Sequence, residues 1–180
     1  MSGDRTITRR EFVSTSAAMG ALAVGPKSLL GAPAIHAPPR VAPLVISDSS
    51  GYRFRNGGPE NSVERAFRGI TEGEDVLDAL MAGVNIPELD PEETGIGYGG
   101  LPNAEGVVQL DACCMHGPKR QAGGVASLEG VRTPSLVAKA VMENTDHHLL
   151  VGEGAQRFAR QLGFTVEDDL NTTRSRERWL

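Results

Sequence analysis

The feature that most limits how this chain can fold is a glycine-rich segment at residues 95–106. Five of its twelve residues are glycine, in a 180-residue chain that holds 22 glycines and 11 prolines. Glycine has no side chain and tolerates positive φ, so such a segment lets a ligand or another strand approach the backbone closely. A phosphate-binding loop would lead into a helix, whereas Pro102 and Gly106 lead into a strand pattern. We therefore expect a hairpin turn at residues 103–106 and no nucleotide site.

Two helices are predicted before this segment. The first begins near Pro59 and ends at Gly73, because apolar residues recur between them at helical spacing. The second begins near Asp75, since acidic residues favour helix N-termini, and ends where Pro87 interrupts it. The side chains expected to face inward are Val63, Ala66, Phe67 and Ile70 in the first helix and Val76, Leu77, Leu80, Met81 and Val84 in the second.

The rest of the pattern alternates strands and helices. Two apolar runs are separated by a short turn at Gly117 and Pro118, and consecutive strands joined in this way pair antiparallel. Thr133 followed by Pro134 is typical of a helix start, and Gly163 ends the last predicted helix. The other predicted elements are a buried strand at 44–47, an acidic solvated turn at 88–93, strands at 107–112, 122–128 and 148–151, and helices from 133 and from 152. This order predicts a layered α/β or α+β domain without internal repeats.

The N-terminus resembles a twin-arginine export signal. Arg9 and Arg10 precede an aromatic and an aliphatic residue, and a weakly apolar stretch at residues 14–24 follows. An amphipathic helix with incidental arginines is the alternative, although its apolar face is poor. Cleavage is expected after Ala34 or, alternatively, after Ala37. The predicted organisation is a signal peptide at residues 1–34, a linker at residues 35–43 and one domain at residues 44–180, working in the periplasm or outside the cell.

Charge and local motifs leave few candidates for a reaction centre. The formal net charge of −5 argues against a nucleic-acid partner, because phosphate recognition needs clustered Lys and Arg. No serine stands in a nucleophile elbow. Asp111, near the end of a predicted strand, is the strongest polar candidate. Its role is either catalytic or the acceptance of hydrogen bonds from the glycine segment.

Two histidine-containing motifs contain residue types that bind metals. His147 and His148 follow Asp146, but neighbours on a strand point to opposite faces and cannot both ligate one ion without a bulge. The adjacent cysteines 113–114 and His116 lack a fourth ligand at zinc-site spacing. The cysteines are better interpreted as small buried residues, because a bond between neighbours is strained. The sequence therefore predicts neither a metal nor a cofactor.

Four blocks occur in the order found in one enzyme family. They are DVLDAL at 75–80, GYGGLPN at 97–103, VQLDA at 108–112 and LLVGEGA at 149–155. The chain resembles the N-terminal, α-subunit portion of the N(4)-(β-N-acetylglucosaminyl)-L-asparaginases, or aspartylglucosaminidases, which are relatives of the isoaspartyl peptidases. The resemblance implies an α+β N-terminal-nucleophile hydrolase fold, an αββα sandwich that this chain would contribute only in part. It also implies hydrolysis of the side-chain amide of asparagine derivatives, without a cofactor.

The resemblance places some residues near a substrate pocket. Gly97, Tyr98, Gly99, Gly100 and Asp111 match blocks beside the family's active site, so they are predicted to support the pocket; packing of a β-hairpin is the alternative. The chain departs from the family pattern at two places. Gly95 stands where a hydroxyl residue usually precedes the glycine segment, and residues 47–51 read SDSSG where glycosylasparaginases usually have Ser-Thr-Trp. The departure at 47–51 weakens the expectation of a glycan-linked substrate and makes free asparagine or a β-aspartyl peptide plausible.

The family's nucleophile is a threonine exposed when the precursor cuts itself in a His-Asp-Thr segment. This sequence contains no Asp-Thr or Gly-Thr dipeptide. The resemblance therefore implies a partner, the threonine-bearing β portion of the same precursor, with αβ units assembling further and Trp179 as a surface anchor. The alternative is an inactive, truncated remnant or a structural α subunit that needs a separate β chain.

Overall fold

The computed structural model describes residues 42–180. The predicted export signal, with Arg9 and Arg10, lies outside the described residues, as do the cleavage sites. None of the described helices is long and apolar enough to cross a membrane. The elements are, in chain order, α2 Ser49–Arg53, α3 Ser62–Glu72, α4 Val76–Leu89, β1 Leu110–His116, β2 Gln121–Leu128, α5 Pro134–Asn144, β3 Leu150–Val151, α6 Gly152–Gln161 and α7 Thr173–Trp179.

A small mixed sheet of order β1-β2-β3 forms the centre of the described part. β1 and β2 are antiparallel, as predicted, and the pairing runs from Leu110 opposite Leu128 to His116 opposite Gln121. A bulge interrupts the register between Leu110 and Ala112. β3 pairs parallel with β2 and holds two residues, where the sequence predicted a strand of four. A mixed sheet with helices gathered on one side makes this an α+β domain.

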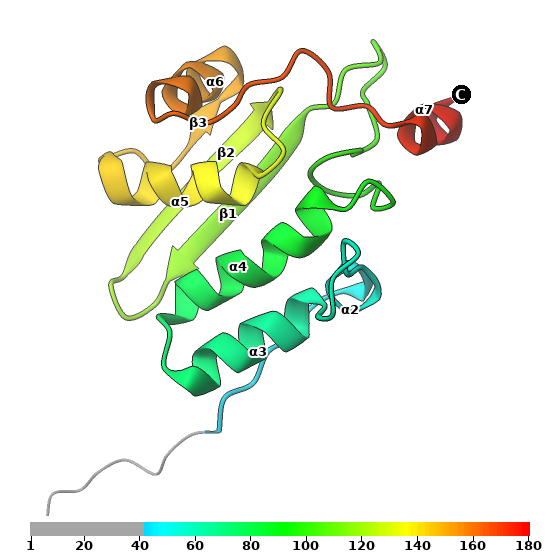
Figure 1. Cartoon of the computed structure of the whole chain (residues 1–180). Coiled ribbons are helices and arrows are strands. Elements are labelled where there is room, and N and C mark those ends of the chain that lie inside the picture. The colour runs from blue at the N-terminus through cyan, green and yellow to red at the C-terminus, as the bar shows by residue number, and fades with distance from the viewer. Residues whose placement is uncertain (1–41) are drawn as a thin grey trace, which may run out of the picture. The chain divides into compact units, whose positions relative to one another are not determined.

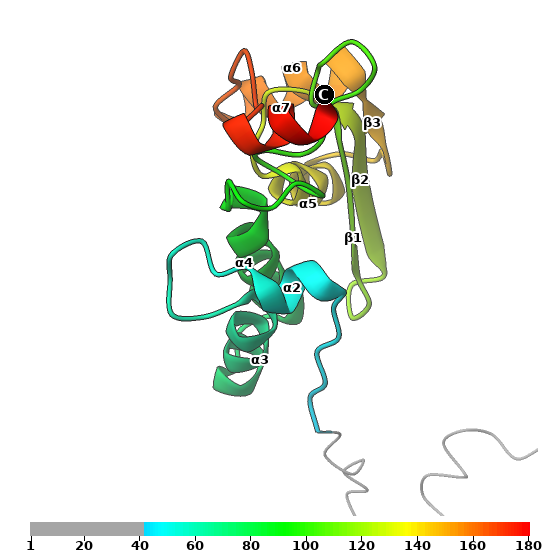
Figure 2. The same ribbon diagram turned by 90° about the vertical axis from the view of Figure 1, so that its right-hand side faces the viewer.

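The helices lie on one side of the sheet (Figures 1 and 2). α4 packs against β1, α5 against β1 and β2, and α6 against β2 and β3. α3 packs on α4, further from the sheet. The buried residues that join these elements are Leu77 and Met81 of α4, Val125 and Leu128 of β2, Val137 and Val141 of α5, and Ala155 and Ala159 of α6. Burial of apolar side chains against one sheet face supplies the main stabilising term. The opposite face has no helix among the described elements.

α3 begins and ends close to the predicted positions, and α4 begins at the predicted one. Asn61 caps α3 in a capping box with Glu64, and Gly73 ends the helix with φ 92°, which glycine adopts without strain. Asp75 caps α4, as the sequence predicted. The predictions that Phe67, Val76 and Leu80 face inward were wrong, because their exposed fractions are 44 %, 37 % and 38 %. The buried positions of α3 are small residues that allow close packing on α4.

The predicted end of α4 at Pro87 was also wrong. The helix continues to Leu89, with Pro87 buried in its last turn. Proline removes only one backbone donor there, and the turn is held from outside by contacts to α5. The acidic segment at 88–93 is not the solvated turn that was predicted, since Glu88, Asp90 and Glu93 are all buried. These carboxylates accept hydrogen bonds that their sequence positions do not reveal.

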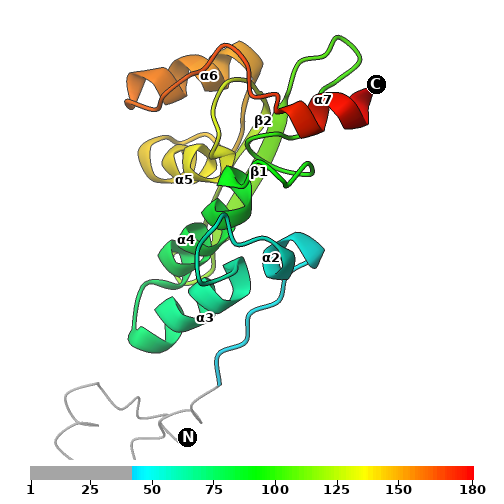
Figure 3. The ribbon, with the colours of Figure 1, turned by 45° about the vertical axis from the view of Figure 1, so that its right-hand side comes forward.

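The predicted strand at residues 44–47 does not form. Leu44 is 78 % exposed and Ile46 is 82 % exposed, and no strand of the described chain pairs with them. A strand needs a neighbour to satisfy its backbone, and the described sheet ends at β1. Two short helices were not predicted: α2, which packs near α3 and α4 (Figure 3), and α7, which is capped by Thr172.

Candidate functional site

A cavity of about 520 Å³ lies beside the glycine segment. Its wall is built from residues 45–47, helices α3 and α4, the glycine segment at 95–97, the start of β1, and the N-terminus of α5. It therefore joins segments that are far apart in the sequence. Two of the predicted pocket residues, Gly97 and Asp111, line it, together with Glu88 and Ser135, which were not singled out from the sequence. A volume of this size suits a small polar substrate.

Position 97 in this cavity wall requires glycine. Its φ is +59°, and a Cβ at this residue would overlap the backbone carbonyl of Glu88. The next residue, Tyr98, donates its backbone N–H to that same carbonyl over 2.7 Å. The glycine therefore lets the segment press directly against the last turn of α4.

The Glu88 carboxyl group is the most deeply placed acid of the cavity wall, at 3 % exposure. Its Oε1 accepts the Ser135 backbone N–H over 3.0 Å, and its Oε2 accepts the Ser135 hydroxyl and the Asn85 amide, each over 2.7 Å. Burial raises the pKa of Glu88, because the ionised form is poorly solvated, although all three hydrogen bonds favour ionisation. A buried, perturbed acid beside a cavity is typical of functional sites.

Sequence reasoning missed Glu88 because α4 was ended at Pro87. A usable signal was present: Leu77, Met81, Val84 and Glu88 continue the spacing of four, three and four residues that marks one helical face. Extending the helix by one turn would have placed this acid on the buried face. A buried acid on an apolar face needs hydrogen-bond donors, and the spacing of residues along the helix does not reveal which groups these are.

Tyr98, Gly99 and Gly100 lie on the other side of the glycine segment and do not line the cavity. The Arg132 guanidinium stacks 3.8 Å above the Tyr98 ring and forms a two-pronged ion pair with Glu167. The Gly99 N–H donates to the Leu170 carbonyl over 3.0 Å, and the Gly100 N–H to the carbonyl of Gly97 over 3.1 Å. These residues join the segment to the C-terminal part of the chain, and so hold Gly97 in place from behind.

Asp111 contacts β2 and not the glycine segment. Its Oδ1 accepts the Ser127 backbone N–H over 2.7 Å. Ser127 has φ 48° and lies in the bulge, where the strand register leaves its N–H without a partner in the ladder. Asp111 therefore satisfies the bulge while its exposed carboxylate lines the cavity.

The other sequence candidates do not meet at this cavity as a reaction centre. Cys113 is exposed, against the prediction that both cysteines are buried, while Cys114 is buried and burial raises the pKa of its thiol. His147 and His148 are exposed. Within residues 42–180, no three His, Cys, Asp or Glu side chains are grouped to hold a metal ion. In the same range, no hydroxyl or thiol side chain is hydrogen bonded to a histidine ring, the arrangement that would activate a nucleophile.

His116 is occupied in the core. Its Nδ1 accepts the Lys119 backbone N–H over 3.0 Å, so the ring proton belongs on Nε2, which donates to Asp75 Oδ2 over 2.9 Å. This bond joins the end of β1 to the start of α4 and explains why an imidazole at 2 % exposure is tolerated.

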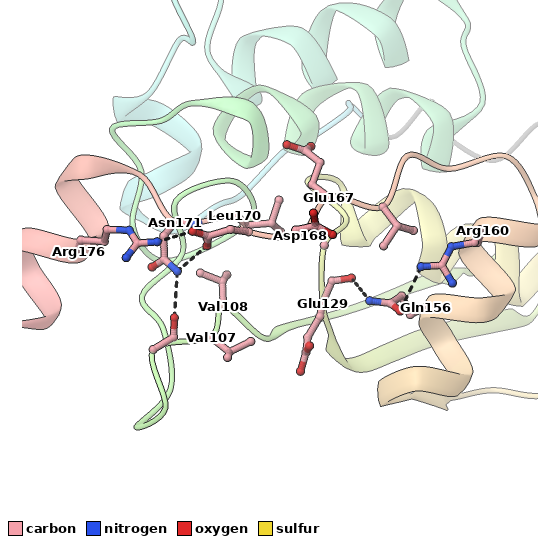
Figure 4. Close-up of a pocket in the computed structure, with 14 residues that line it drawn as sticks. Val107, Val108, Glu129, Gln156, Arg160, Glu167, Asp168, Leu170, Asn171 and Arg176 are labelled. Atoms are coloured by element: carbon pink, nitrogen blue, oxygen red, sulfur yellow. Dashed lines mark hydrogen bonds and ion pairs between the residues drawn. The ribbon is translucent and has the colours of Figure 1, made fainter.

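A second cavity, of about 480 Å³, lies between residues 106–108, residues 129–130 after β2, α6 and the C-terminal segment (Figure 4). Its polar groups are mostly bonded to each other. Asn171 donates to the Gly106 carbonyl over 3.0 Å and to Asp169, which also pairs with Arg176. Gln156 donates to the Glu129 carbonyl over 3.3 Å. These bonds fix the path of residues 166–171 behind the glycine segment. We therefore interpret this cavity as a space left where packed chain segments meet, with a structural role.

Comparison with known proteins decides the family. The sequence profile described as "Asparaginase" matches residues 53–180, which includes the glycine segment, β1 and the acidic last turn of α4. The chain belongs to this asparaginase family. The match confirms the resemblance carried by the four sequence blocks. The matched part includes Gly97, Asp111 and Glu88 of the cavity wall, whereas wall residues 45–47 precede it.

Curated relatives agree with this family. An N(4)-(β-N-acetylglucosaminyl)-L-asparaginase of Elizabethkingia miricola is 38 % identical over 95 % of this chain and 48 % of its own length. A plant-type L-asparaginase of Pyrococcus furiosus is 40 % identical over 68 % of this chain and 39 % of its own length. The mouse N(4)-(β-N-acetylglucosaminyl)-L-asparaginase is 37 % identical over 75 % and 39 %, respectively. This asparaginase-family chain thus spans half or less of the curated relatives that it matches.

Proposed function

We propose that this chain is the α portion of an N-terminal-nucleophile amidohydrolase that cleaves the side-chain amide of asparagine derivatives and releases aspartate. The observation that carries the proposal is the asparaginase-family match over residues 53–180, the part of the chain that builds most of the cavity wall. The relatives named for these activities are about twice as long. A threonine-bearing β portion of the same precursor, freed by self-cleavage, would therefore complete the enzyme.

In this mechanism the α-amino group of the threonine acts as general base to its own hydroxyl. An α-amine has a pKa of about 8, near enough to neutrality to accept that proton, whereas a lysine at about 10.4 does not. The hydroxyl attacks the amide carbon, and the proton taken by the α-amine passes to the amide nitrogen. The C–N bond then breaks, and ammonia or the amine leaves as the acyl-enzyme forms. Water cleaves the resulting ester and releases aspartate. Backbone and side-chain donors at the pocket would hold the oxyanion. The cavity beside Gly97 and Asp111 is the part of that pocket which we assign to this chain.

The uncovered side of the sheet supports completion by further polypeptide. Met115 is 74 % exposed on β1, and Leu149 and Val151 are more than half exposed at β3. Leu44 and Ile46 add an extended apolar segment beside the cavity. Large exposed apolar surfaces mark interaction sites. We propose that the β portion covers this face and completes an αββα sandwich, and that αβ units then assemble further.

Coding sequence beyond Leu180 provides the first test. An in-frame continuation with a His-Asp-Thr segment is expected. Expression of that precursor should then give two chains and release aspartate, and replacement of the first threonine by alanine should abolish both. Full activity of the alanine variant would remove the mechanism. A stop without a companion reading frame would favour the alternative, an inactive remnant.

Substrate preference follows from residues 47–51. Ser47 lines the cavity and the next residues turn into α2, so no tryptophan stands at this wall. We propose that free asparagine or β-aspartyl peptides are preferred over glycan-linked asparagine. Comparing kcat/KM for the three substrates with the completed enzyme tests this, and a strong preference for the glycan-linked substrate would contradict it.

We also propose export by the twin-arginine route. The Arg9 and Arg10 pair within the predicted signal supports this. Replacing both by Lys keeps the charge and should abolish appearance of the protein in the periplasm. Unchanged periplasmic yield would count against the signal.

A further inference from the structure

Three side chains form a closed ring of hydrogen bonds between α4 and α5. Asn85 Nδ2 donates to Glu88 Oε2 over 2.7 Å and to Ser135 Oγ over 3.0 Å. Ser135 Oγ in turn donates to Glu88 Oε2 over 2.7 Å. Each polar hydrogen of the ring has an acceptor. No cation pairs with Glu88 among the described residues, so these neutral donors alone stabilise its charge.

The ring also replaces a missing helix cap. Thr133 is the N-cap of α5, but its side chain makes no capping hydrogen bond. The backbone N–H of Ser135, one of the free donors of the first turn, is instead accepted by Glu88 Oε1 over 3.0 Å. An acidic group is favourable at this helix end, because the helix dipole is positive there. Glu88 therefore fixes where α5 begins.

The backbone of Glu88 fixes the glycine segment. Its carbonyl accepts the Tyr98 N–H, and Gly97 lies in direct contact with it. One residue thus joins α4, α5 and the glycine segment, which are three walls of the 520 Å³ cavity. Disturbance at Glu88 would move all three together.

We propose that Glu88 is a positioning residue for the amide hydrolysis, holding Gly97 and the N-terminus of α5 in the geometry that the substrate meets. It acts through these neighbours, because both of its carboxylate oxygens are already hydrogen bonded to Ser135 and Asn85. This inference rests on the proposed function. Displacement of a pocket wall by about 1 Å can cost as much as 10²-fold in rate, so the effect belongs mainly in kcat.

Variants that remove the ring, or that exchange its donors and acceptors, test whether the ring positions the cavity wall. Glu88→Met removes both carboxylate oxygens, so the Ser135 N–H, the Ser135 hydroxyl and the Asn85 amide lose the acceptor that they share. Glu88→Gln alone does not disrupt the ring, because the Asn85 amide can turn over and present its Oδ1 to the introduced nitrogen. Adding Asn85→Asp replaces that amide with an acceptor. The introduced glutamine amide then donates to the carboxylate at position 85 and to Ser135 Oγ, Ser135 Oγ donates to that carboxylate, and the Ser135 N–H keeps its acceptor. The double variant has the same net charge as the wild type, with every side-chain bond of the ring reversed.

The variants are to be tested in the complete two-chain enzyme. We expect Glu88→Met to lower kcat roughly tenfold or more with a smaller change in KM, and N85D/E88Q to keep kcat within about threefold of wild type. Asn85→Asp alone places two carboxyl groups together and is expected to be as impaired as Glu88→Met. Unchanged kcat in Glu88→Met would overturn the proposal. Recovery of the unfolding midpoint without recovery of kcat would do so as well.

A second measurement does not depend on the activity. Hydrogen exchange of the peptide covering residues 95–101 reports the Tyr98 N–H bond to Glu88. It should accelerate in Glu88→Met and stay at the wild-type rate in N85D/E88Q. If the wild-type enzyme hydrolysed no asparagine derivative, the proposed function would fail, and this exchange pattern would still decide whether Glu88 positions the segment.

Discussion

The two ends of α4 hold carboxyl groups in opposite situations. At the start, Asp75 caps the helix and receives the Nε2–H of His116, and this bond lowers the pKa of Asp75. At the end, Glu88 lies in the ring with Asn85 and Ser135, and burial raises its pKa. The Asp75 side chain is 37 % exposed, whereas Glu88 is 3 % exposed. Solvent access therefore decides whether hydrogen bonds can outweigh the cost of burying a charge.

The difference separates a structural acid from a candidate functional one. Asp75 is stabilised as an anion, as expected for a helix cap that also anchors the core histidine. Glu88 lies beside the cavity, where burying its charge costs free energy, and hydrogen-bond donors from another helix hold it there. Proteins tolerate such costs mainly where a site needs them.

Glycine replacements should show the largest difference between the two ends. Gly97→Ala adds a Cβ that overlaps the Glu88 carbonyl at positive φ, so unfolding free energy should fall by roughly 3–4 kcal/mol. Gly73→Ala, before the start of α4, is the control: its φ is also positive, but nothing lies within 4 Å. It should cost about 1–2 kcal/mol. Equal losses in urea unfolding would show that the contact with Glu88 is not close.

Asp75→Ala should have the next largest effect. It removes the N-cap of α4 and leaves the buried Nε2–H of His116 without an acceptor, so the unfolding midpoint should fall by several degrees. Asp75→Asn keeps an acceptor oxygen and a good cap, and its midpoint should lie much closer to that of the wild type. Calorimetry on both variants measures this. Similar losses would mean that the charge, and not the hydrogen bonds, stabilises this end.

Changes in pH should affect the two ends with opposite sign. Glu88 has a raised pKa in the folded state, so its contribution is full below the ordinary glutamate pKa of about 4.3 and is lost as pH rises through the raised pKa. Wild type should lose stability relative to Glu88→Gln in that window. Asp75 has a lowered pKa, so its contribution is present above about pH 3.9 and is lost as pH falls through the lowered value.

Urea unfolding at a series of pH values measures both slopes. Wild type compared with Asp75→Asn should lose stability toward acid, and compared with Glu88→Gln toward neutrality. Slopes of the same sign for the two pairs would contradict the contrast between the ends of α4.

Asp111→Ala should cause the smallest loss of unfolding free energy, and it gives a reference for the losses at the two ends of α4. Asp111→Ala frees the Ser127 N–H, but water can replace the exposed carboxylate, so the loss should be about 0.5 kcal/mol. Asp111→Asn keeps the acceptor and should be neutral. A loss as large as that of Gly97→Ala would make the bulge an essential part of the fold.

Much of the fold was predictable because its signals are local. Gly73, Asp75 and the turn at Gly117 and Pro118 each act through the conformation of a few neighbouring residues, and all three predictions were confirmed. The site was less predictable. Gly97 and Asp111 were singled out and line the cavity, whereas Glu88 was expected in a solvated turn.

By itself, the sequence determined the glycine end of α3, the cap of α4, the antiparallel hairpin, the α+β class and the family, since each depends on residues close together or on a recognisable order of blocks. The tertiary structure alone decided which acid is buried and which apolar residues stay exposed. Ser135 stands 47 positions from Glu88, and Leu44 finds no strand partner in residues 42–180. Burial and pairing depend on what lies opposite in space, and no local pattern contains that information.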